Sequence, residues 1–143
     1  MGSDRIECVP ATWEADRIVL QRIRRTVFIE EQQVPESDEW DDDDAVSAHL
    51  LVRLNREPVG TGRLNPAGKI GRIAVIAGAR GRGIGALILR RLLDEARRRG
   101  IRRPHLHAQL QALPFYEKFG FRSEGGVFDE AGIPHVRMRL ALE

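Results

Sequence analysis

The chain reads Arg80-Gly81-Arg82-Gly83-Ile84-Gly85-Ala86 between an apolar stretch that ends near Ile76 and an amphipathic segment that ends near Gly100. Glycines lack a Cβ, so the backbone can turn sharply and an anion can approach its N–H groups. The helix that follows adds unpaired N–H donors and the positive end of its dipole. Arginine side chains at this point can donate charge-assisted hydrogen bonds to phosphate. The stretch therefore predicts a strand, a pyrophosphate-binding loop and a helix.

Alternating and helical patterns flank this loop on both sides. Before it, they predict a strand, a helix and three more strands, over residues 5–9, 13–31, 46–54, 59–64 and 69–76. After it, they predict a helix, a strand, a short helix and two strands, over residues 84–100, 105–110, 112–119, 121–128 and 136–142. Tight turns between the strands that precede the loop indicate antiparallel pairing. We expect an α/β (α+β) fold, with a mixed, mostly antiparallel sheet of about seven strands flanked by helices.

The length of 143 residues fits a single domain over residues 1–143. Apolar residues make up 42% of the chain and charged residues 31%, which excludes a disordered chain and a membrane-embedded one. The acidic run at residues 36–44 predicts an exposed, solvated loop. The arginines within residues 97–103 suit the end of a helix better than RNA, because no aromatic residues interleave with them. We expect no nucleic-acid partner and no membrane segment.

Cys8 is the only cysteine, which excludes an internal disulfide and a cysteine metal cluster. It lies beside Val9 in an expected strand, so a buried structural thiol is favoured over a nucleophile. The residues after Met1 are charged and lack the apolar run of a signal peptide. These features predict a cytoplasmic location.

Two other phosphate-binding loops share parts of the glycine pattern. A P-loop needs Lys and then Ser or Thr after its last glycine, where this chain has Ala86-Leu87. A dinucleotide loop is closer, since Gly81, Gly83 and Ala86 satisfy G-x-G-x-x-A. The ribose-binding acid expected about 20 residues later is missing, because Ile101-Arg102-Arg103 occupies that region. An arginine there could still bind a 2′-phosphate, so an NADP-binding oxidoreductase stays open as an alternative.

Three blocks of the chain resemble the GNAT superfamily of N-acetyltransferases. The hallmark of that family is Gln or Arg, two residues, Gly, one residue, then Gly or Ala, and Arg80, Gly83 and Gly85 fit it. Residues 71–76 resemble the family's fourth strand, and residues 114–121, Pro-Phe-Tyr-Glu-Lys-Phe-Gly-Phe, resemble its second signature helix and turn. The blocks lie in the family's order.

A further block is similar to the ElaA-like branch of this family. It has Arg24, Val27-Phe28, Glu31-Gln32 and Val34-Pro35 at the characteristic spacing, and Gly132-Ile-Pro-His135 lies near the end of the chain. The resemblance therefore spans nearly the whole chain.

The resemblance implies a binding site for acetyl-CoA between the fourth and fifth strands, which splay apart. The pantetheine arm would form hydrogen bonds with the backbone of Ile73, Ala74 and Val75, as an extended ligand can with a free strand edge. The pyrophosphate would lie on the glycine loop, whose residues are Arg80, Gly81, Arg82, Gly83, Ile84, Gly85 and Ala86.

The resemblance also implies roles in acetyl transfer, which needs a neutral amine, a polarised carbonyl and a proton for the departing thiolate. Tyr116 matches the tyrosine that the family often uses as general acid, and a backbone N–H near Val75 would polarise the carbonyl. Glu31 is the first candidate for the general base, with His107 and Glu124 as alternatives. We expect no metal, because His105 and His107 share a strand face without a third ligand.

These roles together describe an acetyl-CoA-dependent N-acetyltransferase. It would move an acetyl group to a primary amine of a small molecule or peptide by direct attack in a ternary complex. A non-catalytic acyl-CoA-binding sensor would share the loop and stays open as a second alternative. The acidic run at residues 36–44 could attract a cationic acceptor, and family analogy suggests a homodimer through the last strands. The acceptor and the range of acyl groups are not identified by the sequence.

Overall fold

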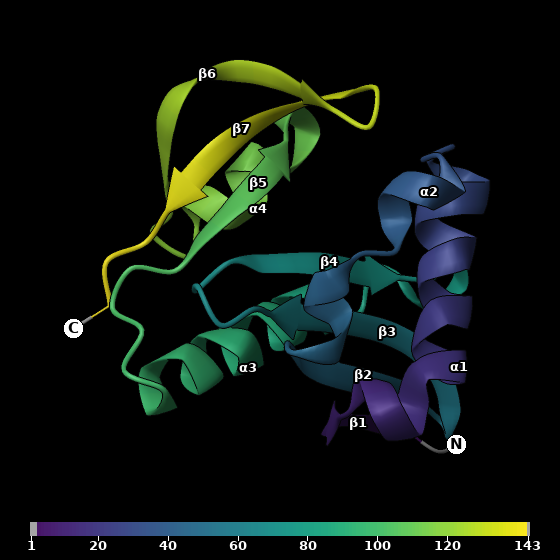
Figure 1. Cartoon of the computed structure of the whole chain (residues 1–143). Coiled ribbons are helices and arrows are strands. Elements are labelled where there is room, and N and C mark those ends of the chain that lie inside the picture. Colours follow the sequence, from purple (N-terminus) through teal and green to yellow (C-terminus); the bar gives the residue numbers. More distant parts are fainter. Residues whose placement is uncertain (1–2, 143) are drawn as a thin grey trace.

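The computed structural model describes residues 3–142, which contain seven strands (Figure 1). They are β1 (Ile6–Ala11), β2 (Ala48–Leu54), β3 (Glu57–Leu64), β4 (Ile70–Val75), β5 (His105–Gln109), β6 (Arg122–Glu130) and β7 (Ile133–Arg139). The α-helices are α1 (Trp13–Arg24), α2 (Glu36–Glu39), α3 (Ile84–Arg98) and α4 (Leu113–Glu117). A π-helix, η1 (Arg25–Glu31), continues α1, and the short 3-10 turns are η2 (Asp42–Ala45), η3 (Ala77–Ala79) and η4 (Leu110–Ala112).

The strands form two antiparallel sheets that one backbone bridge joins. The first sheet has the order β1-β2-β3-β4 and the second has the order β5-β7-β6. A single parallel bridge between Lys69 and His105 joins them at the start of β4 and β5. Beyond this bridge the two strands separate, as Figure 1 shows. The predicted mixed, mostly antiparallel fold with splayed fourth and fifth strands is confirmed, and the antiparallel strands before the loop exclude the dinucleotide-binding alternative.

Helix α3 packs closely on β3 because two glycines in that strand leave room for it. The helix buries Ile84, Ile88 and Leu92, which are spaced four residues apart and so lie on one face. A Cβ added to Gly62 would lie 2.6 Å from Cγ2 of Ile88, and one added to Gly60 would lie 3.3 Å from Ile84. The close packing holds the N-terminus of α3 beside the end of β4.

The opposite face of the sheet is covered by α1 and η1. Thr12 caps α1 by accepting a hydrogen bond from the Ala15 N–H, and Leu20, Ile23 and Val27 are buried against the sheet. The predicted helix over residues 13–31 is α-helical only as far as Arg24, after which the backbone continues as a π-helix. No helix within residues 3–142 is long and apolar enough to cross a membrane.

The acidic run at residues 36–44 is only partly the exposed loop that the sequence predicts, because it contains α2 and the start of η2 and buries two of its acids. Glu39 and Asp44 are buried, with only 3% and 1% of their surface exposed. Arg24 lies between them and donates from Nε to Glu39, at 2.8 Å, and from Nη1 to Asp44, at 2.6 Å. The sequence did not predict that these two acids are buried, because their partner Arg24 belongs to α1. Arg24 lies 15 and 20 residues before them in the chain.

Two further arginines complete this buried ion-pair network. Arg63 of β3 donates to Asp41 and Asp44, each at 2.7 Å. Arg72 of β4 lies 3.1 Å from Glu39 through its Nε. Burying a charge is costly unless it is paired and hydrogen-bonded, so the acids pack on the sheet only because three arginines meet them there.

Replacing Arg24 by Met should lower the free energy of unfolding by about 3–5 kcal/mol, because Glu39 and Asp44 would each lose a buried cation. Arg25→Met is the matched control, since the neighbouring arginine pairs with Glu36 at the surface and such pairs contribute little. Urea unfolding followed by circular dichroism measures both. Equal losses in the two variants would contradict a stabilising role for the buried network.

Candidate functional site

The glycine loop has the backbone conformation that its sequence predicts. Gly81 and Gly83 have positive φ angles of 80° and 77°, in the region that other residues rarely adopt. Gly83 is the N-cap of α3, and a Cβ at either glycine would meet no atom within 4 Å. The space beside this backbone, at the positive end of a 15-residue helix, is therefore open to a ligand.

Strand β4 offers a backbone edge that β3 does not use. The Ile76 N–H donates to the Val59 carbonyl oxygen at 2.9 Å, and Val75 lies opposite Gly60. Because antiparallel strands alternate the direction of their peptide groups, the N–H and C=O of Val75 point to the other edge, toward β5. Ala74 is different, since it pairs opposite Thr61 and is buried under α1.

A β-bulge interrupts β4 just before these residues. The register with β3 shifts between Thr61 and Arg63, and Arg72 in the bulge has a φ of 52°. A bulge leaves one residue out of the ladder and bends its strand. The bend lies where β4 and β5 begin to separate, and the Arg72 side chain turns toward the buried acids.

Two of the predicted site residues, Glu31 and Arg80, contact each other. The Arg80 guanidinium donates to both Glu31 carboxylate oxygens, at 2.7 and 2.6 Å, and its Nε donates to the Val75 carbonyl oxygen at 2.9 Å. This hydrogen-bonded pair lowers the pKa of Glu31 and raises the pKa of Arg80. A lowered pKa makes Glu31 a weaker proton acceptor, which favours a role in holding Arg80. The other loop arginine, Arg82, pairs with Asp4 near the N-terminus.

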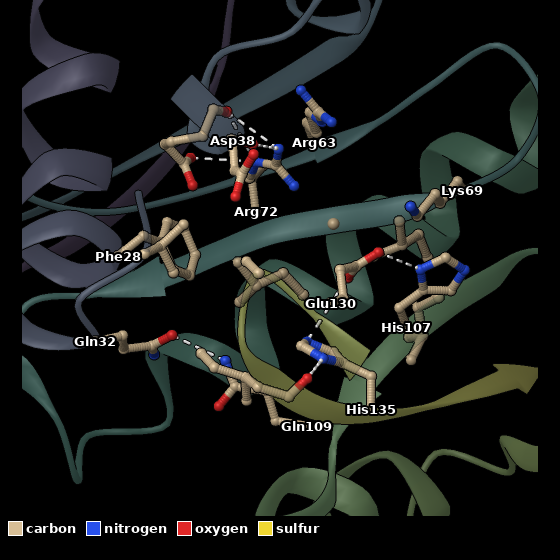
Figure 2. A pocket seen from close by; sticks show the side chains of 18 of the residues that line it. Phe28, Gln32, Asp38, Arg63, Lys69, Arg72, His107, Gln109, Glu130 and His135 are labelled. Atoms are coloured by element: carbon tan, nitrogen blue, oxygen red, sulfur yellow. Dashed lines mark hydrogen bonds and ion pairs between the residues drawn. The ribbon is translucent and has the colours of Figure 1, made fainter. Parts of the chain in front are cut away.

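A cavity of about 570 Å³ lies between the two sheets (Figure 2). Its lining comes from many elements, including Ile73 of β4, His107 of β5, Tyr116 of α4, Glu130 of β6 and His135 of β7. The acidic segment and η1 close one side. The divergence of β4 and β5 thus creates a polar space into which residues far apart in the sequence project.

Tyr116 enters this cavity from α4, within an aromatic cluster. Its ring makes edge contacts with Phe115 and Phe121, with centroids 5.1 and 6.0 Å apart. Burial raises the pKa of Tyr116 to about 12. The phenol therefore keeps its proton near neutral pH, as a hydrogen-bond or proton donor must.

The sequence did not single out Glu130, which lies between two histidines in the cavity. Its Oε1 accepts a hydrogen bond from His107 Nδ1 at 2.9 Å, and its Oε2 lies 3.7 Å from His135 Nε2. Burial opposes ionisation, but the His107 hydrogen bond and nearby positive charge hold the pKa of Glu130 below its usual value. The Gly132-Ile-Pro-His135 block was the available signal, because it places a histidine close to the β6–β7 turn.

The remaining candidates lie elsewhere. Glu124 pairs with Arg137 and Arg139 outside the cavity lining. Cys8 is half-buried in β1, where burial raises the pKa of its thiol despite the nearby Arg91. Within residues 3–142, no three His, Cys, Asp or Glu side chains are grouped so that they could hold a metal ion.

The Tyr116 phenol should titrate near pH 12 in the folded protein and near its usual value of about 10 in urea. Because the folded-state pKa is raised, the stability gained by burying the neutral phenol is present below pH 10 and is lost as the pH rises through 12. Tyr116 is the only tyrosine in the chain, so tyrosinate absorbance reports it directly. A single midpoint near 10 in both states would contradict the burial.

Comparison with known proteins places these features in context. Residues 18–142 match the family described as the acetyltransferase (GNAT) domain. A Bacillus subtilis protein named uncharacterized N-acetyltransferase YjcF is 40% identical over 121 residues, which cover 81% of this chain and 86% of that protein. Protein ElaA of Escherichia coli is 32% identical over 127 residues, which cover 83% of each chain.

Solved structures resemble the fold over nearly its full length. The crystal structure of Escherichia coli ElaA matches with a TM-score of 0.84 and 28% identity, and covers 94% of this chain and 99% of its own. The structure of a GNAT family acetyltransferase from Elizabethkingia anophelis with acetyl-CoA bound matches with a TM-score of 0.74. That match covers 98% of this chain and all of the other at 19% identity, and it concerns the fold alone.

Proposed function

The chain belongs to the acetyltransferase (GNAT) domain family and is an N-acetyltransferase, and from this premise we propose how it works. Acetyl-CoA supplies the acetyl group as a thioester. The acceptor is a primary amine of a small molecule or peptide, which attacks the thioester directly while both substrates are bound. The resemblance to the ElaA-like branch is confirmed by the match to ElaA in sequence and in structure.

The observation that carries this proposal is that Ile73 and Tyr116 line the same cavity. Ile73 belongs to the strand assigned to the pantetheine arm, and Tyr116 is the assigned acid. One space therefore adjoins both the strand that would hold the thioester and the tyrosine that would donate to its sulfur. A phenol that burial keeps protonated is suited to donate to a developing thiolate.

Backbone groups of the loop and of the β4 edge support the assignment of acetyl-CoA. The Val75 N–H points away from β3, whereas the Val75 carbonyl oxygen accepts from Arg80 Nε at 2.9 Å. We assign the pyrophosphate to the loop from Gly81 to Ala86, with Arg80 and Arg82 at its rim. The pantetheine amides are assigned to the edge that Val75 presents, with Ile73 beside it. Ala74 lies between Ile73 and Val75, but its own N–H and C=O point toward β3. We therefore assign it no backbone hydrogen bond to the pantetheine arm. The open positions at Gly81 and Gly83 support this fit.

Glu31 was the first candidate for the general base. Its pairing with Arg80 and its lowered pKa favour another arrangement, in which Glu31 orients Arg80 beside the loop. The cytoplasmic location, the single domain over residues 1–143 and a homodimer through the last strands stay predictions. The exposed residues along β6 are compatible with such a dimer.

Acetyl-CoA should bind to the purified chain with a saturable heat in isothermal titration calorimetry. Free CoA should appear when a panel of amines, polyamines, amino acids and peptides is added, because thiol release follows acetyl transfer. Reduced NADP serves as the control ligand and should give no saturable heat. No heat with acetyl-CoA at millimolar concentration would contradict the cofactor assignment, and binding without thiol release would indicate a sensor.

Replacing Tyr116 by Phe should lower kcat by about a hundredfold or more with an acceptor from that panel, since the proton donor is removed while the ring remains. Affinity for acetyl-CoA should stay the same, because the assigned phosphate and pantetheine contacts are on other elements. Calorimetry and thiol release measure the two quantities separately. Unchanged turnover would remove the acid role of Tyr116.

A further inference from the structure

Glu130 and His135 face each other in the cavity, where the dashed line between them in Figure 2 marks a 3.7 Å contact that is too long for a hydrogen bond. His135 Nδ1 lies 2.7 Å from the carbonyl oxygen of Ile133, so Nδ1 carries the proton that it donates there. In a neutral imidazole the other nitrogen, Nε2, is then an acceptor. Nε2 and Glu130 Oε2, which lie 3.7 Å apart, are thus two hydrogen-bond acceptors. A ligand with two N–H or O–H donors can bind to both.

Both groups are held in place by their surroundings. The His135 side chain is 90% buried, and its ring stacks on Phe128 with centroids 6.1 Å apart. His107 donates to Oε1 of Glu130 at 2.9 Å and meets the edge of Phe128 at 5.0 Å between centroids. Glu130 is therefore anchored through one oxygen, while Oε2 is left to contact a ligand.

The chain does not fill this gap with a cation of its own. Lys69 also lines the cavity, but within residues 3–142 the ion-pair partners of Glu130 are the two histidines. A carboxylate and an imidazole lone pair that face the same gap form a suitable site for a group with several N–H donors and a positive charge.

We propose that Glu130 Oε2 and His135 Nε2 form the subsite for the primary ammonium of the acceptor. This assignment rests on the proposed function and replaces Glu31 as the base. Glu130 binds the ammonium as its counterion, and His135 accepts its proton. His107 is a positioning residue, because it acts by holding Oε1 of Glu130.

The proton transfers balance the reaction. The ammonium passes one proton to His135 Nε2, which releases it to solvent, and the neutral amine nitrogen attacks the acetyl carbonyl carbon. A C–N bond forms and the C–S bond breaks, with the electron pair leaving on sulfur. The sulfur takes a proton from Tyr116, and the second proton that the nitrogen loses restores the phenol. The products are an amide and free CoA.

Imidazole nitrogen NMR on the full chain tests the subsite without turnover. The probes are n-propylammonium, propan-1-ol and propionate, which match in size and differ in charge. We expect a saturable shift of His135 Nε2 with n-propylammonium alone, with the signal assigned by its loss in His135→Gln. The absence of a shift with n-propylammonium would overturn the proposal, because it would mean that no amine binds there. An equal shift with propan-1-ol would also overturn it, because the site would then accept any neutral hydrogen-bond donor.

Substitutions of Glu130 and of its neighbour Asp129, both on β6, test whether the charge of Glu130 in particular binds the ammonium. Glu130→Gln should weaken n-propylammonium binding by about tenfold or more, because a charge-assisted hydrogen bond is lost. Asp129→Asn removes the same charge from the adjacent exposed residue and should change nothing. Equal affinities in the two variants would overturn the proposal. If Glu130→Gln does not fold, the comparison of the three probes on the natural chain decides.

The positioning role of His107 has its own readout. His107→Asn keeps a side-chain N–H donor and should retain n-propylammonium binding, whereas His107→Ala should weaken it. Acetyl-CoA calorimetry on the same samples distinguishes the two levels of inference. On the natural chain, the absence of an n-propylammonium shift with acetyl-CoA binding intact refutes the subsite alone, whereas the absence of acetyl-CoA binding refutes the proposed function.

Discussion

The rest of the structure depends on a backbone edge that is paired on one side and open on the other. Strand β4 is in register with β3, yet it meets β5 only through the bridge between Lys69 and His105. Buried peptide groups need partners, so an edge left open by the fold suits an extended ligand that carries amides. The same separation of strands opens the cavity into which Tyr116 projects.

The buried ion-pair network supplies one wall of that cavity. The acidic segment packs against β3 and β4 because Arg24, Arg63 and Arg72 meet Glu39, Asp41 and Asp44 with short hydrogen bonds. The desolvation cost of such charges is large, and only satisfied geometry offsets it. Glu39 and Asp41, which line the cavity, are therefore committed to arginines, whereas the ion-pair partners of Glu130 are two histidines.

Local features were predictable because their causes are local. Gly81 and Gly83 adopt positive φ angles for the reason that their positions in the sequence indicated, and α3 begins directly after them. The pairing of Arg80 with Glu31 was not predictable, since 49 residues separate them. Glu130 was not predicted either, because the nearby Gly132-Ile-Pro-His135 block indicates a histidine, and His107, which holds the carboxylate, belongs to β5.

The sequence by itself determined the order of the strands and of the helices α1, α3 and α4, the glycine loop and the family, because periodicity, glycine conformation and motif order are carried by neighbouring residues. Tertiary structure alone decided which charges are buried and which imidazole faces which carboxylate. The buried charges join α1, α2, η2, β3 and β4, and the imidazole and carboxylate contacts join β5, β6 and β7. The energies of these contacts depend on distance and desolvation. These distances and the extent of desolvation are set only when the chain has folded and the elements have packed against one another.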